Sequence, residues 1–187
     1  MQRELVERAQ AGDHEAFAEL VRASFPRLHG AARLILRDPD GAQDAVQEAF
    51  VLAWRHVRAL REPSAWDAWL HRLTVRACYR AARKARRRDL IEVPAVLDQD
   101  LGAGGDLAMV VAQNDQLGRE LRRLPIDQRA VMVLHFYVDL PLPEVAAILE
   151  IPVGTAKSRL HRGLAAMRAA MPAEPSEPVR LAQERLA

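Results

Sequence analysis

Apolar residues recur every three or four positions along most of this chain, which is the spacing of helices that bury one face. Gly, Pro and Asp clusters interrupt the pattern at intervals. The pattern predicts helices over residues 2–11, 14–36, 40–57, 64–88, 106–124, 142–149 and 153–167. The expected fold class is therefore all-α, with Pro26 expected to kink the second helix.

Polar residues mark where several of these helices should begin, because a side-chain oxygen can accept from the free N–H groups of a first turn. The predicted caps are, in order, Asp13, Asp40 paired with Gln43, Ser64, Asp106 and Asp127. The run RAVMVLHFYV at residues 129–138 is rich in valine and aromatic residues, as strands often are. Its position between two clear helices favours a helix instead.

The stretch from 142 to 167 predicts two short helices separated by a break at residues 150–152. An apolar stripe runs along the second helix, and its other side carries four donors: Lys157, Ser158, His161 and Arg162. Such a pair of helices is typical of a motif that places one helix in the major groove of DNA. A solvated basic face is the alternative interpretation of the same residues.

Composition and charge limit the number of domains and the class of protein further. Half of the 187 residues are apolar and only 5% are aromatic, which suits one domain or two small ones. Neither a membrane-length apolar run nor a secretion leader is present, so we expect a cytoplasmic protein. The net charge of +2 hides a segregation, with eight basic residues over 72–88 and six acidic residues over 89–118.

This segregation predicts two domains and a linker. We expect an amino-terminal domain over residues 1–88, a flexible acidic linker over 89–105, a helix-turn-helix domain over 106–171 and a mobile tail over 172–187. The linker can be interpreted as a mimic of a polyanion or as a solubilising spacer, and the sequence leaves both open.

Candidate chemistry is sparse. The single cysteine, Cys78, lies in a helical pattern and is expected to be a small core residue. The six histidines show no metal-ligand spacing, so we expect neither a metal site nor a cofactor. A helical enzyme with Asp38, Asp40, Asp44 and Glu48 around a divalent metal is the most distant alternative, and the sequence favours a protein that is not an enzyme.

Two helices carry candidate interaction faces. On the helix over 40–57, Asp44, Gln47, Glu48 and Val51 share one face, and Phe50 and Trp54 add apolar area at its edge, which indicates a protein-docking face. On the helix over 64–88, the tryptophans share a core stripe with leucines. Another side, expected to meet a DNA backbone, carries Arg72, Arg76, Tyr79, Arg80 and Arg83.

Three stretches together resemble a known family. DGAQDAVQEAFVLAW, then SAWDAWLHRLTVRACY with an arginine run, then RAVMVLHFYVDLPLPEVAAILEIPVGTAKSRLHRGL are similar in order and spacing to an extracytoplasmic-function (ECF) sigma factor of bacterial RNA polymerase. The resemblance covers roughly residues 5–170. It implies two helical domains, sigma region 2 and sigma region 4, with a flexible linker between them. Family members often end the first helix of the helix-turn-helix with glycine, where this chain has Glu150.

The resemblance also implies roles for particular positions. Docking on a coiled coil of the polymerase's largest subunit would use Asp44, Gln47, Glu48, Phe50 and Trp54. Minus-ten DNA, with one base flipped into the loop over 58–64, would meet Arg61, Ser64, Arg72, Arg76, Tyr79, Arg80 and Arg83. Minus-thirty-five DNA would meet Thr155, Lys157, Ser158, Arg159, His161 and Arg162. Many family members carry asparagine and aspartate where this chain has Arg76 and Arg80, so roles known at those two positions do not transfer.

The function implied is promoter selection for core RNA polymerase, with no active site on this chain. Its expected partners are core polymerase, promoter DNA and an anti-sigma factor, with no small-molecule substrate and no insertion into a membrane. A stand-alone helix-turn-helix regulator with a dimerising or sensing amino-terminal domain is the alternative, and it predicts specific binding to free DNA.

Overall fold

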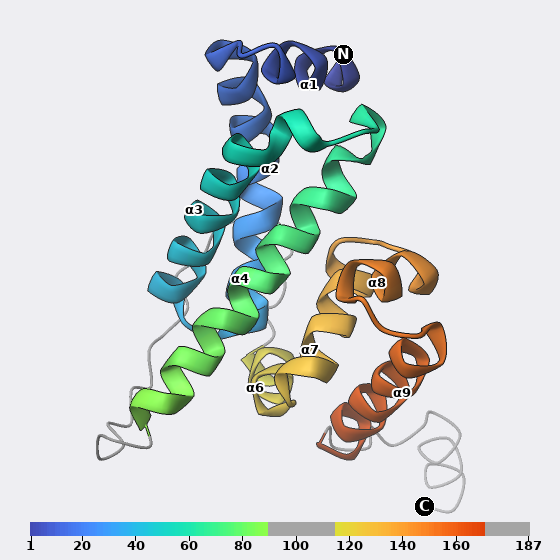
Figure 1. The fold of residues 1–187 in the computed structure, drawn as a ribbon. Helices are drawn as coiled ribbons and strands as arrows, with labels where there is room; N and C mark the ends of the chain where they lie inside the picture. The colour runs from blue at the N-terminus through green and yellow to red at the C-terminus, as the bar shows by residue number, and fades with distance from the viewer. Residues whose placement is uncertain (90–114, 171–187) are drawn as a thin grey trace, which may run out of the picture.

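The computed structural model describes residues 1–89 and 115–170, and every regular element within those two ranges is helical (Figure 1). The all-α fold predicted from the apolar spacing is therefore confirmed. The run over 129–138, which had strand-like composition, is also helical. The predicted linker over 89–105, apart from Asp89, the helix start at Asp106 and the tail from 172 lie outside the described residues.

The amino-terminal half is built from four helices whose limits lie close to those predicted. They are α1 (Gln2–Gln10), α2 (His14–Leu36), α3 (Pro39–His56) and α4 (Trp66–Asp89), with 3-10 turns at Val57–Ala59 and Pro63–Ala65. α2, α3 and α4 pack side by side, and α1 lies across one end of them (Figure 1). α2 continues through Pro26 as one helix.

The residues that cap α2 and α3 agree only in part with the prediction. Asp13 accepts from the N–H groups of Glu15 and Ala16, as predicted. The prediction of Asp40 as the cap of α3 is wrong, because Asp38 accepts from the Asp40 N–H at 3.1 Å. Proline at the first helical position needs no N–H partner, so Asp38-Pro39 begins the helix more favourably than Asp40 would.

Ser64 does not cap α4 either. It lies inside the 3-10 turn that precedes the helix, and the Glu62 carboxylate accepts both the Ser64 N–H and its hydroxyl. Only Ala65 lies between Ser64 and Trp66, where α4 begins. The Glu62 side chain therefore stabilises the turn that leads into α4.

The core of this half is apolar. Its largest buried side chains come from all four helices: Val6, Leu20, Leu28, Ile35, Val46, Trp66 and Leu70. Burying each of these contributes roughly 1.5–3 kcal/mol relative to leaving it exposed. Cys78 is also fully buried, and burial raises the pKa of its thiol to about 12, so the predicted core role of this cysteine is confirmed.

The carboxyl-terminal half consists of shorter helices. They are α6 (Asp115–Arg123), α7 (Ile126–Met132), a π-helix (Val133–Tyr137), α8 (Leu142–Leu149) and α9 (Val153–Ala170). Asp127 is not the cap of α7, because Pro125 occupies that position and makes no side-chain bond. α9 packs on α6, α7 and α8, so its apolar stripe is buried by three neighbours.

The two halves also contact each other. α7 and the π-helix pack against α2, and α8 packs against α4 (Figure 1). The sequence predicted two domains but gave no reason to expect a specific contact between them. This contact determines which of the candidate side chains face solvent.

Candidate nucleic-acid interface

The polar face of α9 is exposed as the sequence predicted. Lys157, Ser158, His161 and Arg162 all face solvent, and the opposite stripe of Ala156, Leu160 and Met167 is buried. Within the described residues, the hydrogen bonds of this face stay inside its own helix, with Arg162 donating to the Ser158 carbonyl and hydroxyl at 3.3 Å. The face therefore presents donors that no other described element occupies, as a groove-reading helix requires.

Arg159 and Thr155 differ from those four residues, because both are only partly exposed. The Arg159 side chain is 22% exposed, and its Nη2 lies 3.0 Å from Oδ2 of Asp127 on α7. This ion pair braces α9 against α7 and explains why Asp127 is not free to cap a helix. A phosphate contact by Arg159 would have to replace Asp127. Thr155 accepts a hydrogen bond from Ser158 through its carbonyl at 3.0 Å.

The turn before α9 is closed by a residue in a strained conformation. Glu150 ends α8 with φ 56° and ψ 43°, the left-handed region that favours glycine. Ile151 donates to the Ala146 carbonyl at 3.0 Å, which closes the turn in the manner that glycine-terminated helices use. Glu150 thus adopts the left-handed turn conformation that glycine usually adopts at this position in the family.

The basic face of α4 is less available than its sequence suggests. Arg76 pairs with Glu150 of α8, and Arg80 pairs with Glu48 of α3 at 2.9 Å. Tyr79 is half-buried, and its pKa is raised by burial and by the charge of Asp127. Arg76 and Arg80 stay exposed although each already pairs with a carboxylate, and that this side of α4 meets a DNA backbone stays a prediction. Arg83 remains exposed, and Arg72 is half-buried with an unpartnered Nε among the described atoms.

The loop between α3 and α4 holds the remaining candidates for minus-ten contact. Arg61 and Ser64 are both exposed. The Ser64 hydroxyl donates to Oε1 of Glu62 at 2.9 Å, and this bond is the main cause that lowers the pKa of Glu62. A base entering this loop would meet a serine whose hydroxyl proton is already engaged.

The candidate docking face on α3 is acidic but not aromatic. Asp44, Gln47 and Glu48 are exposed. Phe50 is only 9% exposed and belongs to the core, so its predicted place on the face is wrong. The apolar residue on this face is Val51, which is 49% exposed. The helical spacing in the sequence had already placed Val51 on this face with Glu48, three positions earlier.

Trp54 packs inward rather than forming a free aromatic edge. Its ring centroid lies 4.6 Å from that of His14 and 4.8 Å from that of Phe17. Both partners belong to α2, so Trp54 joins α3 to α2 and is half-exposed. Replacing Trp54 would therefore disturb packing as well as any surface it contributes.

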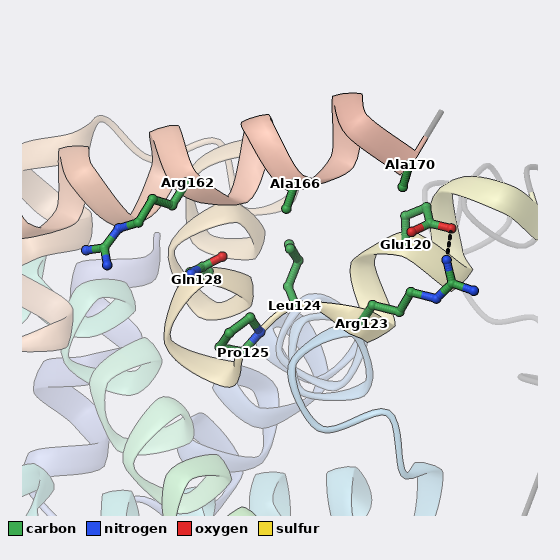
Figure 2. A pocket seen from close by; sticks show the side chains of 8 residues that line it. All are labelled: Glu120, Arg123, Leu124, Pro125, Gln128, Arg162, Ala166 and Ala170. Carbon is green, nitrogen blue, oxygen red and sulfur yellow. Dashed lines mark hydrogen bonds and ion pairs between the residues drawn. The ribbon is translucent and has the colours of Figure 1, made fainter. Parts of the chain in front are cut away.

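Figure 2 shows a groove that the sequence did not indicate. It has a volume of about 450 Å³ and lies among α6, α7 and α9, with Leu124, Pro125 and Ala166 on its walls. Glu120 is buried at one end and pairs with Arg123 at 2.7 Å. The Arg162 guanidinium lies at the other end and is turned away from this pair.

Metal chemistry finds no support in the side chains that the structure describes. No group of three or more His, Cys, Asp or Glu residues within the described ranges could hold a metal ion. Of the acids in the enzyme alternative, Asp38 caps α3 and Glu48 pairs with Arg80. A search of the described helices also finds none that could cross a membrane.

Comparisons with known proteins agree with this arrangement. Residues 20–88 match the family model described as Sigma-70 region 2, and residues 114–167 match the model described as Sigma-70, region 4. The chain is 34% identical over 162 residues to the ECF RNA polymerase sigma factor SigM of Mycobacterium tuberculosis, covering 87% of this chain and 80% of the relative. It is 37% identical over 171 residues to the ECF RNA polymerase sigma-E factor of Escherichia coli K12, covering 84% and 87%.

Solved structures of the same fold also exist. CnrH in complex with the cytosolic domain of CnrY matches with a TM-score of 0.66 and 25% identity, over 90% of this chain and 95% of that one. The sigma factor RpoE from Bartonella quintana, in complex with the anti-sigma factor NepR, matches with a TM-score of 0.66 and 24% identity, over 82% and 95%. The second likeness concerns the fold alone.

Proposed function

Because the chain belongs to the ECF sigma factors of bacterial RNA polymerase and directs that enzyme to promoters, we propose that its two domains read two promoter elements separately. The domain over 1–88 would meet minus-ten DNA through α4 and the loop before it. The domain over 106–171 would meet minus-thirty-five DNA through α9. The acidic segment over 89–105 would join them, and residues 172–187 would form a tail.

The observation that carries this proposal is the exposed polar face of α9. Its four donors are held by a buried apolar stripe and by α7 and α8, so the helix has a fixed angle on its domain. Arginine paired to guanine and lysine or serine to phosphate are contacts that this face can make in a major groove. Arg162 is the side chain we assign to a base edge, and Thr155, Lys157 and Ser158 to the backbone.

Polymerase docking is assigned to α3. Its exposed acids, Asp44 and Glu48, flank Gln47 on one side of the helix, and Val51 supplies apolar area beside them. Charged residues that surround a small apolar patch are typical of a transient protein interface. Trp54 would support this face from beneath rather than contact the polymerase with its whole ring.

The chain itself would carry no active site. Core polymerase would perform the chemistry, while the loop over 58–64 would hold a base that leaves the minus-ten duplex. Extruding a base costs a few kcal/mol of stacking, so Arg61 and the Glu62–Ser64 pair would have to supply replacement contacts. The place of action would be the cytoplasm, where RNA polymerase transcribes DNA.

Regulation by an anti-sigma factor is a further part of the proposal. The family resemblance implies such a partner, and the complex of CnrH with the cytosolic domain of CnrY supports a search for one. Pull-down of the full chain from the cell that encodes it, followed by transcription with the captured protein added, would identify a partner that silences the chain.

The test of promoter reading mixes the purified chain with core RNA polymerase and a library of genomic promoter fragments, and maps the transcript starts. We expect chain-dependent starts that share two sequence motifs. Glu48→Lys and Val51→Asp should each abolish most of these starts, because they change the docking face. Val51→Asp leaves the Glu48–Arg80 pair in place.

A matched control is Glu4→Lys, which makes the same charge change on an exposed residue of α1. This variant should support the same starts as the unmodified chain. Absence of chain-dependent starts, together with tight and specific binding of the chain to free DNA, would instead favour the stand-alone regulator.

A further inference from the structure

The groove among α6, α7 and α9 has one of its ends at Ala170, the last residue of α9 (Figure 2). Its wall on α9 is a row at four-residue spacing, in which Ala166 and Ala170 follow Arg162. Leu124 and Pro125 form the facing wall. Small side chains on one wall and apolar side chains on the other leave room for an extended segment of chain to lie along the helix.

Prolines recur at every third position in the segment that follows Ala170, at 172, 175 and 178. Proline fixes its own φ at about −65° and disfavours the α conformation of the residue before it. These two constraints cover each proline and its preceding neighbour. The spacing therefore predicts a polyproline II helix over 171–179, a conformation that loses little entropy when it binds a groove.

The side chains of this predicted helix fall on three edges, because polyproline II has three residues per turn. The prolines occupy one edge, and Glu174 and Glu177 occupy the next. The third edge carries Ala173, Ser176 and Val179. The proline and glutamate edges can therefore face a groove together, with the third edge toward solvent.

The length of the groove fits this segment. The eight positions of α9 between its two ends span about 12 Å at 1.5 Å per residue. A polyproline II helix covers the same length in about four residues at 3.1 Å per residue. A chain that reverses over 171–173 would place Glu174 beside Arg123. Glu177 would then lie beside Arg162, at the other end of the groove.

The charges at the two ends fit this direction. The Arg123 side chain is 72% exposed although it pairs with the buried Glu120 at 2.7 Å, so it keeps donors on its solvent side. Arg162 is exposed, and its two hydrogen bonds within α9 are both 3.3 Å, longer than most bonds of this kind. A carboxylate can therefore bond each arginine without breaking a buried contact.

We propose that residues 171–179 bind back into the groove among α6, α7 and α9 as a polyproline II helix, with Glu177 paired to Arg162. Because segment and groove belong to one chain, the effective concentration is roughly millimolar, and weak contacts suffice to keep the segment bound. The consequence for DNA rests on the proposed role of Arg162 at a base edge. The acidic segment and minus-thirty-five DNA would compete for this guanidinium.

Nuclear magnetic resonance of the full chain tests the docking. A nitroxide on Ser176→Cys, which lies on the solvent edge, should broaden the amide signals of Gln128 and Ala166. The amide of Glu4, on α1 at the far end of the molecule, should stay sharp (Figure 1). Cys78 should stay unlabelled, because burial raises the pKa of its thiol to about 12. Sharp signals at all three amides would overturn the docking.

Ala166→Leu fills the groove from an exposed position and should restore the sharp signal of Gln128. Ala165→Leu makes the same change on an exposed neighbour outside the groove, and should leave the broadening in place. Pro175→Gly should weaken the broadening, because it frees the segment to adopt other conformations. Broadening that persists in Ala166→Leu would overturn the groove as the binding site.

A mixed sample identifies whose segment is bound. Chains that carry the nitroxide are combined with isotope-labelled chains that lack it, and only the labelled chains are observed. Docking within one chain predicts sharp signals from the labelled chains. Broadening of Gln128 in this mixture would overturn docking within one chain and assign the groove to the segment of a second copy.

Glu177→Gln tests the competition with DNA. The affinity of holoenzyme for a duplex with the mapped minus-thirty-five motif should rise about fivefold if Arg162 is held in about four-fifths of the molecules. Glu184→Gln makes the same change beyond the prolines and should leave the affinity unchanged. Equal affinities of the two variants would overturn the competition. Failure of the proposed function would show separately, as absent transcript starts while the broadening of Gln128 persists.

Discussion

The two basic helices of this protein differ in what their side chains already contact. On α9, Arg162 bonds only within its own helix, and Lys157 and His161 face solvent. On α4, Arg76 and Arg80 are each paired with a carboxylate from another helix. A count of arginines would rank α4 as the stronger candidate surface, yet the polar face of α9 is the one whose donors no other described element occupies. The charge pattern of the sequence indicates a candidate binding surface, and the packing of neighbouring helices decides which of its side chains are already paired.

The ion pairs themselves are a weak obstacle on α4. Exposed pairs of this kind are worth roughly 0–1 kcal/mol, so phosphate could replace the carboxylates. At Arg76 a second element is also present, because α8, which ends at Glu150, packs on α4. The Arg80 pair thus lies within the amino-terminal half, whereas the Arg76 pair joins the two halves.

The largest effect we expect is the salt dependence of DNA binding. If four to six arginines of α4 contact phosphate, the slope of log affinity against log salt should be roughly −3 to −5, so a fourfold rise in salt costs about a hundredfold to a thousandfold. Replacing Arg72, Arg76 and Arg83 by alanine should flatten this slope, whereas Arg55→Ala on α3 should not. A slope near zero in the unmodified chain would remove α4 from the DNA interface.

Arg129 tests how firmly the two domains are joined. Arg129→Met should lower the free energy of unfolding by roughly 2–4 kcal/mol, because it leaves buried carbonyls at Ile35 and Leu124 without donors. Urea denaturation measures the change, with Arg86→Met, an exposed arginine of α4, as the control. A loss as small as the control's would mean that water satisfies these carbonyls.

Arg162 tests whether the open face of α9 reads sequence. Arg162→Ala should weaken binding to the matched minus-thirty-five duplex by about 1–3 kcal/mol, if the guanidinium bonds a guanine through two donors. Fluorescence anisotropy of holoenzyme on matched and altered duplexes measures it, and Arg168→Ala provides a control on the same helix. Equal weakening on both duplexes would assign Arg162 to phosphate instead.

Arg80 should give the smallest effect on stability. Arg80→Ala breaks an exposed pair with Glu48 and should cost less than about 1 kcal/mol in thermal denaturation. It should still make the salt slope shallower by roughly 0.7–0.9, the contribution of one phosphate. An unchanged slope would show that Arg80 stays with Glu48 when DNA binds, and the matching variant Glu48→Gln would then leave the slope unchanged as well.

Local pattern predicted most of the helices because the apolar spacing repeats over many turns. α2 begins and ends where the pattern placed it, at His14 and Leu36. The caps were less predictable, since Asp38 and Asp40 are equivalent in propensity and only Pro39 favours the first. Phe50 was misplaced for a similar reason, because on a helix with several apolar sides spacing alone does not show which side a neighbour covers.

The sequence by itself determined the helices, the charge blocks, the donors on α9 and the family, because each depends on residues close together in the chain. Only the tertiary structure decided that Gly30 receives Tyr137, that Arg129 caps α2 and that Arg76 meets Glu150. These partners are separated by 107, 94 and 74 positions (Gly30 to Tyr137, Ile35 to Arg129, Arg76 to Glu150). No periodicity within a helix carries information over such separations, whereas packing of one helix on another brings the partners together.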